Sequence, residues 1–268
     1  MLNNIHETID FISANTRIRP TTGIILGTGL GGLIDEIEIS KKIPYKDIPH
    51  FPTSTVEGHS GNLILGKLNN HRVVVMQGRF HYYEGYSMQE VTFPVRILKG
   101  LGIQQLFLSN AAGGINPDFS IGDLMTITDH INLFPDNPLR GPNDDNLGPR
   151  FPDMSEPYSQ KLIDQAHEIA GSLGFKLHKG VYVGNQGPSF ETPAEYTFYR
   201  LIGGSAVGMS TVPEVIVARH MGLPVFAVSV ITNIAVPGNF QKNNHLDVQE
   251  AAEQAGKNLA QLCKEMLT

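Results

Sequence analysis

Cysteine is almost absent from this sequence: Cys263 is the single cysteine among 268 residues. One cysteine cannot form a disulfide within the chain, and this usage fits a reducing compartment, so we expect a cytoplasmic protein. Cys263 falls in the apolar stripe of a predicted C-terminal helix. There we expect it to pack as a small core side chain and not to act as a nucleophile.

Long apolar runs and basic runs are missing as well. No stretch approaches membrane-spanning length, and the N-terminal MLNNIHETID lacks the pattern of a secretion signal, so no membrane partner is expected. The chain has 20 Lys and Arg against 26 Asp and Glu, a formal net charge of −6. Without a basic run we expect no nucleic-acid partner, although local donors can still bind a phosphate group.

The sequence also lacks a metal-binding motif. No group of histidine, cysteine or carboxylate residues has the spacing that metal ligands require. Two glycine-rich stretches resemble nucleotide-binding loops but lack required parts. GTGLGG at 27–32 matches the dinucleotide fingerprint, yet the segment after it is short and soon reaches Pro44. GNLILGKL at 61–68 has no hydroxyl after Lys67, and its apolar interior indicates a strand. GTGLGG remains a candidate anion-binding turn, to which Thr28 adds a hydroxyl.

What the sequence does contain is an alternation of strand and helix patterns. Short apolar, β-branched runs predict strands at 21–26, 72–77, 104–109, 124–129, 180–185 and 224–232. Helical spacing with capping residues predicts helices at 87–102, 158–174, 192–204, 211–222 and about 247–267. The alternation indicates one α/β domain over residues 1–268, with a mostly parallel or mixed sheet covered by helices. The longest irregular stretch, 135–157, has the length of a functional or interface loop.

Polar side chains follow the carboxyl ends of several predicted strands, where ligands bind to α/β sheets. In FLSNAAGGINP, 107–117, an apolar run gives way to small residues. This predicts a turn at which an anion can approach backbone N–H groups, with a tight turn under a packed neighbour as the alternative. The groups that together match a free phosphate are Thr28, Arg79, His81, Ser210 and the N–H groups around Ala112.

A second set of side chains could hold a heterocycle. Phe190 and Tyr83 offer flat apolar faces, while Glu191 and Asn233 can form hydrogen bonds. Taken singly, each residue also has a simpler interpretation. Arg79 could form a surface ion pair, Phe190 could be a core side chain, and Glu191 could be a charge at a helix N-terminus.

The motifs GTGLGG, VEGHSG, GRFHYYEGY, SNAAGG, DHINL, NPLRGPND, GPSFET, VGMSTVPEVIVARH and ITN occur in this order. From about Gly23 to the final helix, the chain closely resembles the trimeric purine nucleoside phosphorylases that cleave inosine and guanosine. The resemblance implies one α/β domain around a mixed, twisted sheet, and a homotrimer. It also implies a pentosyltransferase that uses inorganic phosphate as co-substrate, with no metal or organic cofactor. The reaction converts 6-oxopurine ribonucleosides or deoxyribonucleosides to the free base and the sugar 1-phosphate, as in purine salvage.

Site residues carried over by motif fall into three groups. The resemblance assigns phosphate binding to Thr28, His59, Arg79, His81, Ala112 and Ser210. It assigns the nucleoside to Tyr83, Phe190, Glu191, Met209, Asn233 and His245, with Asn233, His81 and Glu191 as the catalytic residues. It places Phe151, in the 135–157 stretch, in the site of a neighbouring subunit. One departure is Thr28, where many relatives have serine, but the hydroxyl is retained.

Three other functions compete with this interpretation. One is a nucleoside hydrolase, which is less favoured because the donors fit phosphate better than water. Methylthioadenosine phosphorylases share the GTGL and TVPEV patterns, but they carry aspartate at the position of Asn233 and lack a polar residue for a five-prime hydroxyl. Asn233, Glu191 and His245 together argue against that specificity. A non-catalytic nucleoside- or phosphate-binding protein on the same fold would bind these ligands without forming product.

Overall fold

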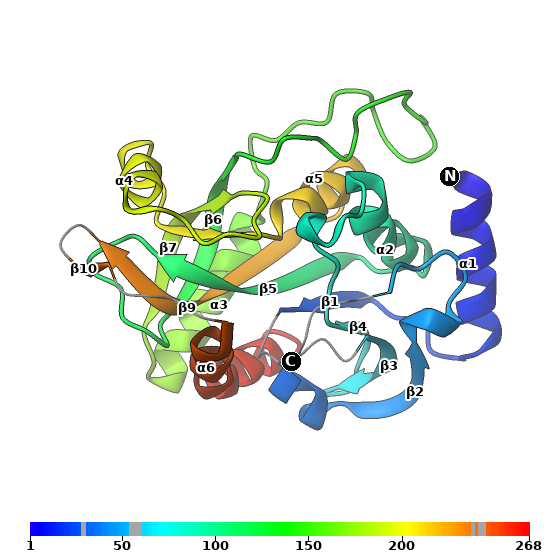
Figure 1. Ribbon diagram of the computed structural model, residues 1–268. Helices are drawn as coiled ribbons and strands as arrows, with labels where there is room; N and C mark the ends of the chain where they lie inside the picture. The colour runs from blue at the N-terminus through cyan, green and yellow to red at the C-terminus, as the bar shows by residue number, and fades with distance from the viewer. Residues whose placement is uncertain (28–30, 54–60, 237–238, 241–244) are drawn as a thin grey trace.

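The structure is a computed structural model that describes residues 1–27, 31–53, 61–236, 239–240 and 245–268 (Figure 1). Two residues predicted to bind phosphate, Thr28 and His59, lie outside these described residues. The α-helices are α1 (Leu2–Ala14), α2 (Met88–Gly100), α3 (Gln160–Leu173), α4 (Pro193–Leu201), α5 (Val212–His220) and α6 (His245–Glu265). Three short 3-10 helices are η1 (Gly31–Glu36), η2 (Tyr45–Asp47) and η3 (Tyr82–Glu84).

The strands form one mixed sheet, as the resemblance implied. They are β1 (Thr22–Leu26), β2 (Glu38–Pro44), β3 (Asn62–Leu68), β4 (His71–Gln77), β5 (Gln105–Gly114), β6 (Leu124–Asn132), β7 (Leu177–Gly184), β8 (Ala206–Gly208), β9 (Val225–Val236) and β10 (Asn239–Phe240). Their order is β10-β9-β6-β7-β8-β5-β1-β4-β3-β2, and β9 also pairs with β5. Because β9 pairs with both β6 and β5, the strands β9, β6, β7, β8 and β5 form a closed ring. The sheet continues from β5 as an open, four-stranded extension through β1, β4, β3 and β2.

Helices cover both faces of this sheet, which explains why most strands are apolar on both sides. In Figure 1, α2 and α5 lie above the strands and α6 lies below them. α2 packs against α5, and α3 against α6. Apolar residues recur at helical spacing along α6 and just beyond it, and they are buried: Ala251, Ala255, Leu259, Leu262 and Met266. Among the described residues, no helix is long and apolar enough to span a membrane.

The predicted end of the strand at 104–109 is wrong. β5 continues through the small residues to Gly114, and it keeps pairing with β9 across an irregularity between Ala112 and Gly113. The small residues are explained by crowding from β9. A Cβ on Gly113 would lie 3.1 Å from the Asn233 amide nitrogen, and one on Gly114 would lie 2.8 Å from Ile231. The close neighbour is therefore β9, which is nearer to the alternative of a packed neighbour, although the backbone here is a strand and not a turn.

The N-terminal caps of α4 and α5 differ from each other. The cap expected from sequence forms in α4 and does not form in α5. Thr192 caps α4 through a capping box with Glu195, and Pro193 is the first helical residue. The same design was expected at Thr211, yet Thr211 makes no capping hydrogen bond and has φ +70° and ψ −54°. α5 begins directly after this unusual residue. Cys263 in α6 is buried as expected, and burial raises its thiol pKa to about 12.

Candidate active site

A cavity of about 640 Å³ lies where seven described segments of the chain meet. It is lined by nine of the predicted site residues: Arg79, His81, Tyr83, Ala112, Phe190, Glu191, Met209, Ser210 and Asn233. The structure thus brings together residues that lie up to 154 positions apart in the sequence. His245 begins α6, but its side chain is not among those described. Phe151 does not line the cavity and is 87% exposed.

One end of the cavity is organised by a buried arginine. Arg79 is 1% exposed, so it is not a surface residue. Its Nη1 donates to the Ser109 carbonyl oxygen at 2.6 Å and to Ser210 Oγ at 3.3 Å, while its Nε donates to Glu214 Oε1 at 3.2 Å. These contacts hold the guanidinium plane in one orientation. A buried guanidinium fixed in this way, beside a hydroxyl, suits an anionic oxygen ligand.

His81 stands next to this arginine and is held by a carboxylate. Its Nδ1 lies 3.1 Å from Glu84 Oε1, and its backbone N–H donates to the same oxygen at 2.7 Å. Since a carboxylate only accepts, Nδ1 carries the hydrogen, and Nε2 is an acceptor in the neutral ring and a donor in the protonated ring. Burial lowers the pKa of His81, which favours the neutral ring. The Tyr83 ring stacks on this imidazole at 4.7 Å between centroids.

Two further polar groups, Asn233 and Glu191, line the cavity. Asn233 lies inside β9 and not beyond its end, so the strand is longer than predicted. Thr232 Oγ1 lies 3.4 Å from Asn233 Oδ1, a long contact, and the Asn233 amide nitrogen is buried without a hydrogen-bond partner among the described residues. Glu191 Oε1 accepts from Asn185 Nδ2 at 2.7 Å. A donor and a carboxylate therefore both line the cavity.

The simpler interpretations of the aromatic and acidic residues are not what the structure shows. Phe190 is 42% exposed at the cavity and is not a core side chain. Glu191 precedes the N-cap Thr192, and the capping carboxylate of α4 belongs to Glu195. Glu191 is instead held by Asn185, the polar residue that ends the predicted strand at 180–185.

The supporting residues were mostly missed by sequence reasoning. Asn110, Asn185 and Glu214 each contact a predicted site residue or its immediate neighbour. Asn185 and Asn110 could have been found, since each is a polar residue at or near the end of an apolar run. Glu214 had no such signal, because a glutamate in the first turn of a helix is ordinary.

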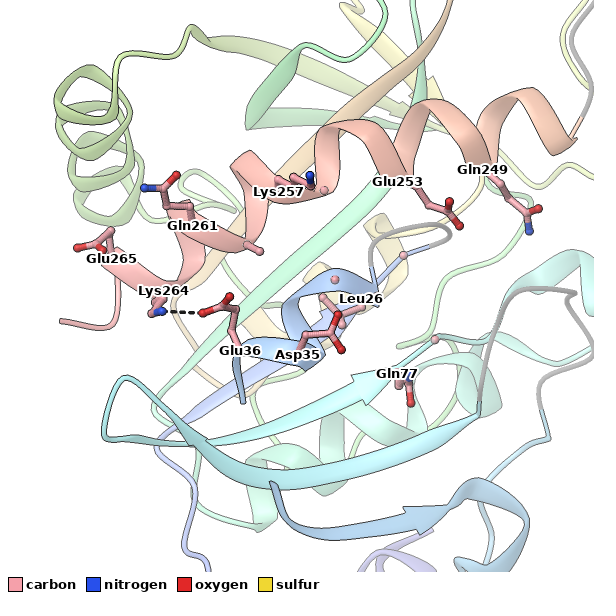
Figure 2. Close-up of a pocket in the computed structure, with 16 residues that line it drawn as sticks. Leu26, Asp35, Glu36, Gln77, Gln249, Glu253, Lys257, Gln261, Lys264 and Glu265 are labelled. Atoms are coloured by element: carbon pink, nitrogen blue, oxygen red, sulfur yellow. Dashed lines mark hydrogen bonds and ion pairs between the residues drawn. The ribbon is translucent and has the colours of Figure 1, made fainter. Parts of the chain in front are cut away.

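A second, larger cavity of about 1030 Å³ lies between α6 and η1 (Figure 2). Its side chains are mostly charged or amide groups, and Lys264 Nζ forms an ion pair with Glu36 Oε2 at 2.6 Å across its mouth. It shares Gly27 with the first cavity but contains none of the predicted site residues that the structure describes. The smaller cavity is therefore the candidate active site.

Comparisons with known proteins find relatives that match nearly the whole chain. The family model described as the phosphorylase superfamily matches residues 21–268. The chain is 56% identical to purine nucleoside phosphorylase 1 of Geobacillus stearothermophilus, over 93% of this chain and 91% of that protein. It superposes with a TM-score of 0.94 on Schistosoma mansoni purine nucleoside phosphorylase in complex with adenosine, at 45% identity over 98% of this chain and 96% of the other. Isoform 2 of the Schistosoma mansoni enzyme, in complex with cytosine and ribose-1-phosphate, gives a TM-score of 0.95 at 45% identity, over 99% of this chain and 96% of the other.

Proposed function

This chain belongs to the phosphorylase superfamily and is an enzyme of its purine nucleoside phosphorylase branch, and we propose that its substrates are 6-oxopurine nucleosides. In this proposal inosine, guanosine and their deoxy forms react with inorganic phosphate. The C1′–N9 bond breaks, a phosphate oxygen bonds to C1′, and the purine leaves with the electron pair and takes up a proton. The products are the free base and ribose or deoxyribose 1-phosphate.

The phosphate end of the proposed site contains the buried donors. Arg79 and Ser210 supply charge and a hydroxyl, and His81 adds a ring nitrogen. Thr28, His59 and the backbone at Ala112 complete the proposed set. A phosphate held against the anomeric carbon stabilises the positive charge that develops on the ribosyl group. Its fixed position also replaces a random encounter.

The base end supplies the observation on which the proposal mainly rests. The Asn233 amide nitrogen is buried in the cavity without a partner among the described residues, and an unpaired buried donor costs free energy unless a ligand uses it. A departing purine gathers negative charge on its ring nitrogens. A donor aimed there is stronger in the transition state than in the ground state, which is the requirement for catalysis.

The preference for a 6-oxo group follows from Glu191. Hypoxanthine and guanine carry a hydrogen on N1, which a carboxylate can accept. Adenine presents a lone pair at N1 instead and would leave the carboxylate unpaired. Phe190 provides a flat surface for the ring, Tyr83 and Met209 line the space for the ribose, and His245 is proposed to meet the five-prime hydroxyl.

The proposed assembly is a homotrimer that works in the cytoplasm with no metal or organic cofactor. Among the described residues no group of histidine, cysteine and carboxylate side chains could hold a metal ion. Phe151 supports shared sites, because a phenylalanine that is 87% exposed on one subunit can fill a cavity on the next. The irregular stretch 135–157 that carries it would then help to close the neighbouring pocket.

The deciding experiment measures hypoxanthine release from inosine, coupled to uric-acid formation, with and without inorganic phosphate. Adenosine and methylthioadenosine are run in parallel, with release of their bases followed by chromatography. We expect phosphate-dependent cleavage of inosine and guanosine and a much lower kcat/KM for the two adenine nucleosides. Equal or better cleavage of adenosine would refute the 6-oxopurine proposal, and release at full rate without phosphate would refute phosphorolysis.

A further inference from the structure

Ser210 stands beside a strained turn of the backbone. The N–H of Val212 donates to the carbonyl oxygen of Ser210 at 2.7 Å, which closes a three-residue γ-turn around Thr211. With φ +70° and ψ −54°, Thr211 adopts the rare positive-φ form of this turn. Thr211 is β-branched and buried, so its side chain makes this conformation more unfavourable still. Such strain persists only where the surroundings impose it, and it clusters at functional sites.

The surroundings that impose it are a neighbouring strand and one side chain. Asn110, which is 1% exposed in β5, donates from Nδ2 to Thr211 Oγ1 at 2.8 Å. Thr211 Oγ1 lies 3.1 Å from Ser210 Oγ, and Ser210 Oγ also accepts from Arg79 Nη1 at 3.3 Å. Asn110 and Ser210 both line the candidate active site, whereas Thr211 does not. The threonine thus connects two cavity residues from behind.

The direction of one of these hydrogen bonds is fixed by its groups. The amide nitrogen of Asn110 only donates, so Thr211 Oγ1 accepts there, whereas either hydroxyl can donate between Thr211 Oγ1 and Ser210 Oγ. With Thr211 as that donor, Ser210 Oγ accepts from both Thr211 and Arg79. Its single hydrogen has no other use in this chain of bonds and remains for an acceptor in the cavity. In this arrangement, Asn110 and Thr211 leave the Ser210 hydroxyl as a donor to the cavity.

We propose that Asn110 and Thr211 are positioning residues for phosphate, which orient the Ser210 hydroxyl as a donor to the anion by acting on it through the strained turn. This inference rests on the proposed function, because phosphate is the anion that it requires. The inference goes beyond the proposed function because it assigns a role to two residues that are not among the proposed phosphate-binding residues. Replacing either residue should weaken phosphate binding and leave nucleoside binding nearly intact.

Thr211→Val is the principal test, since valine keeps the shape and β-branching of threonine and removes only the hydroxyl. We expect KM for phosphate to rise about tenfold to 100-fold, the usual effect of losing one hydrogen bond to a charged group. KM for inosine at saturating phosphate should change by less than about threefold, because the base and ribose contacts are untouched. A general structural role would shift both constants, so an unchanged KM for phosphate, or equal shifts of both, would overturn the inference.

Two further variants separate the hydroxyl from the backbone. Thr211→Ser keeps the hydroxyl and is expected to keep KM for phosphate within about threefold of the wild type. In a Ser210→Ala background, Thr211→Val should have little additional effect, because its route to the anion is already removed. Full additivity of the two changes, or a Thr211→Ser variant as impaired as Thr211→Val, would contradict the proposed chain of bonds.

The experiment also distinguishes this inference from the function on which it rests. A wild-type enzyme that needs no phosphate would refute the proposed function and the inference together. A phosphate-dependent wild type with an unaffected Thr211→Val variant would refute the inference alone. Should Thr211→Val fail to fold, Asn110→Ala carries the same prediction. In the Asn110→Ala variant, added inorganic phosphate should raise the unfolding temperature by less than it does in the wild type.

Discussion

Three of the polar side chains that line the active-site cavity are held by a second polar residue. Asn185 holds Glu191, Glu84 holds His81, and Glu214 holds Arg79. A ligand-binding group that is free to rotate pays entropy when it binds, so fixing it in advance strengthens binding and aligns it for reaction. For Arg79 the partner, Glu214, is also a countercharge. It offsets the cost of burying the positive guanidinium group.

Asn233→Ala tests the contribution of the buried amide to leaving-group stabilisation. Because this donor is expected to act mainly in the transition state, kcat for inosine should fall about 10²–10³-fold, as when one such donor is removed elsewhere. KM for phosphate should change little, since Asn233 is not among the proposed phosphate contacts. Steady-state kinetics with each substrate varied in turn measure both. A large loss of phosphate affinity with near-normal turnover would contradict the role.

Glu191→Gln tests base selection, and Asn185 makes its outcome specific. Asn185 Nδ2 donates to one oxygen of Glu191, so it should orient the glutamine oxygen toward itself and leave the NH₂ facing the base. Two donors would then meet at N1 of hypoxanthine, whereas N1 of adenine would gain a partner. We expect kcat/KM for inosine and guanosine to fall by about 10²-fold or more and the ratio of adenosine to inosine to rise. Unchanged ratios would remove Glu191 from base recognition.

Among the longer segments, the irregular region between β6 and α3 depends on a few contacts with α5. Asn143 donates to the Gly148 carbonyl oxygen at 2.9 Å, and Asn143 Oδ1 lies 3.3 Å from His220 Nε2. Gly148 has φ +149°, and a Cβ there would collide with the His220 carbonyl oxygen. Glycine is therefore required at this position twice over, by conformation and by space.

Gly148→Ala should consequently destabilise the protein by about 2–3 kcal/mol, because the loop must move away from α5 to admit the methyl group. Chemical denaturation at a fixed protein concentration measures the change. The matched control is Gly171→Ala inside α3, where a Cβ meets nothing within 4 Å. That substitution should stabilise the helix by about 0.5–1 kcal/mol. Equal effects of the two substitutions would contradict the collision with α5.

Across the whole molecule, the described histidines with a shifted pKa all shift in the same direction. The pKa is lowered for His81, His130, His167 and His220, in each case mainly because burial disfavours the charged ring. Unfolding exposes these rings and returns each pKa to about 6.5. Between that value and the lower folded values, the unfolded chain binds more protons than the folded chain.

The free energy of unfolding should therefore fall as the pH drops below about 6.5, with a slope of up to about 1.4 kcal/mol per pH unit for each histidine. Denaturation curves between pH 7.5 and pH 5 measure it, above the range in which most carboxylates titrate. His130→Gln removes one of the four rings and should reduce the slope. A stability that is constant over this interval, or that rises toward pH 5, would contradict the folded-state shifts.

Much of the architecture follows from local patterns in the chain. The six predicted strands and five predicted helices all form, because apolar periodicity and capping residues such as Thr192 act over a few neighbouring positions. The cavity was also foreseeable in outline, since parallel strands bring polar residues at their carboxyl ends to one edge of the sheet. Arg79 and Glu191 reach the cavity from segments that follow β4 and β7, whereas Asn233 lies inside β9.

Contacts between distant segments settled the remainder. β5 continues through its glycines because β9 pairs with it along its length. The two strands lie about 120 residues apart in the sequence, so no local pattern predicts this pairing. Thr211 holds a conformation that its own type disfavours because Asn110, in another strand, binds its hydroxyl. Secondary-structure propensity depends on residues that are close in the sequence. Strand pairing, side-chain burial and backbone strain depend on residues that only folding brings together. The positions of the reactive groups belong to this second class.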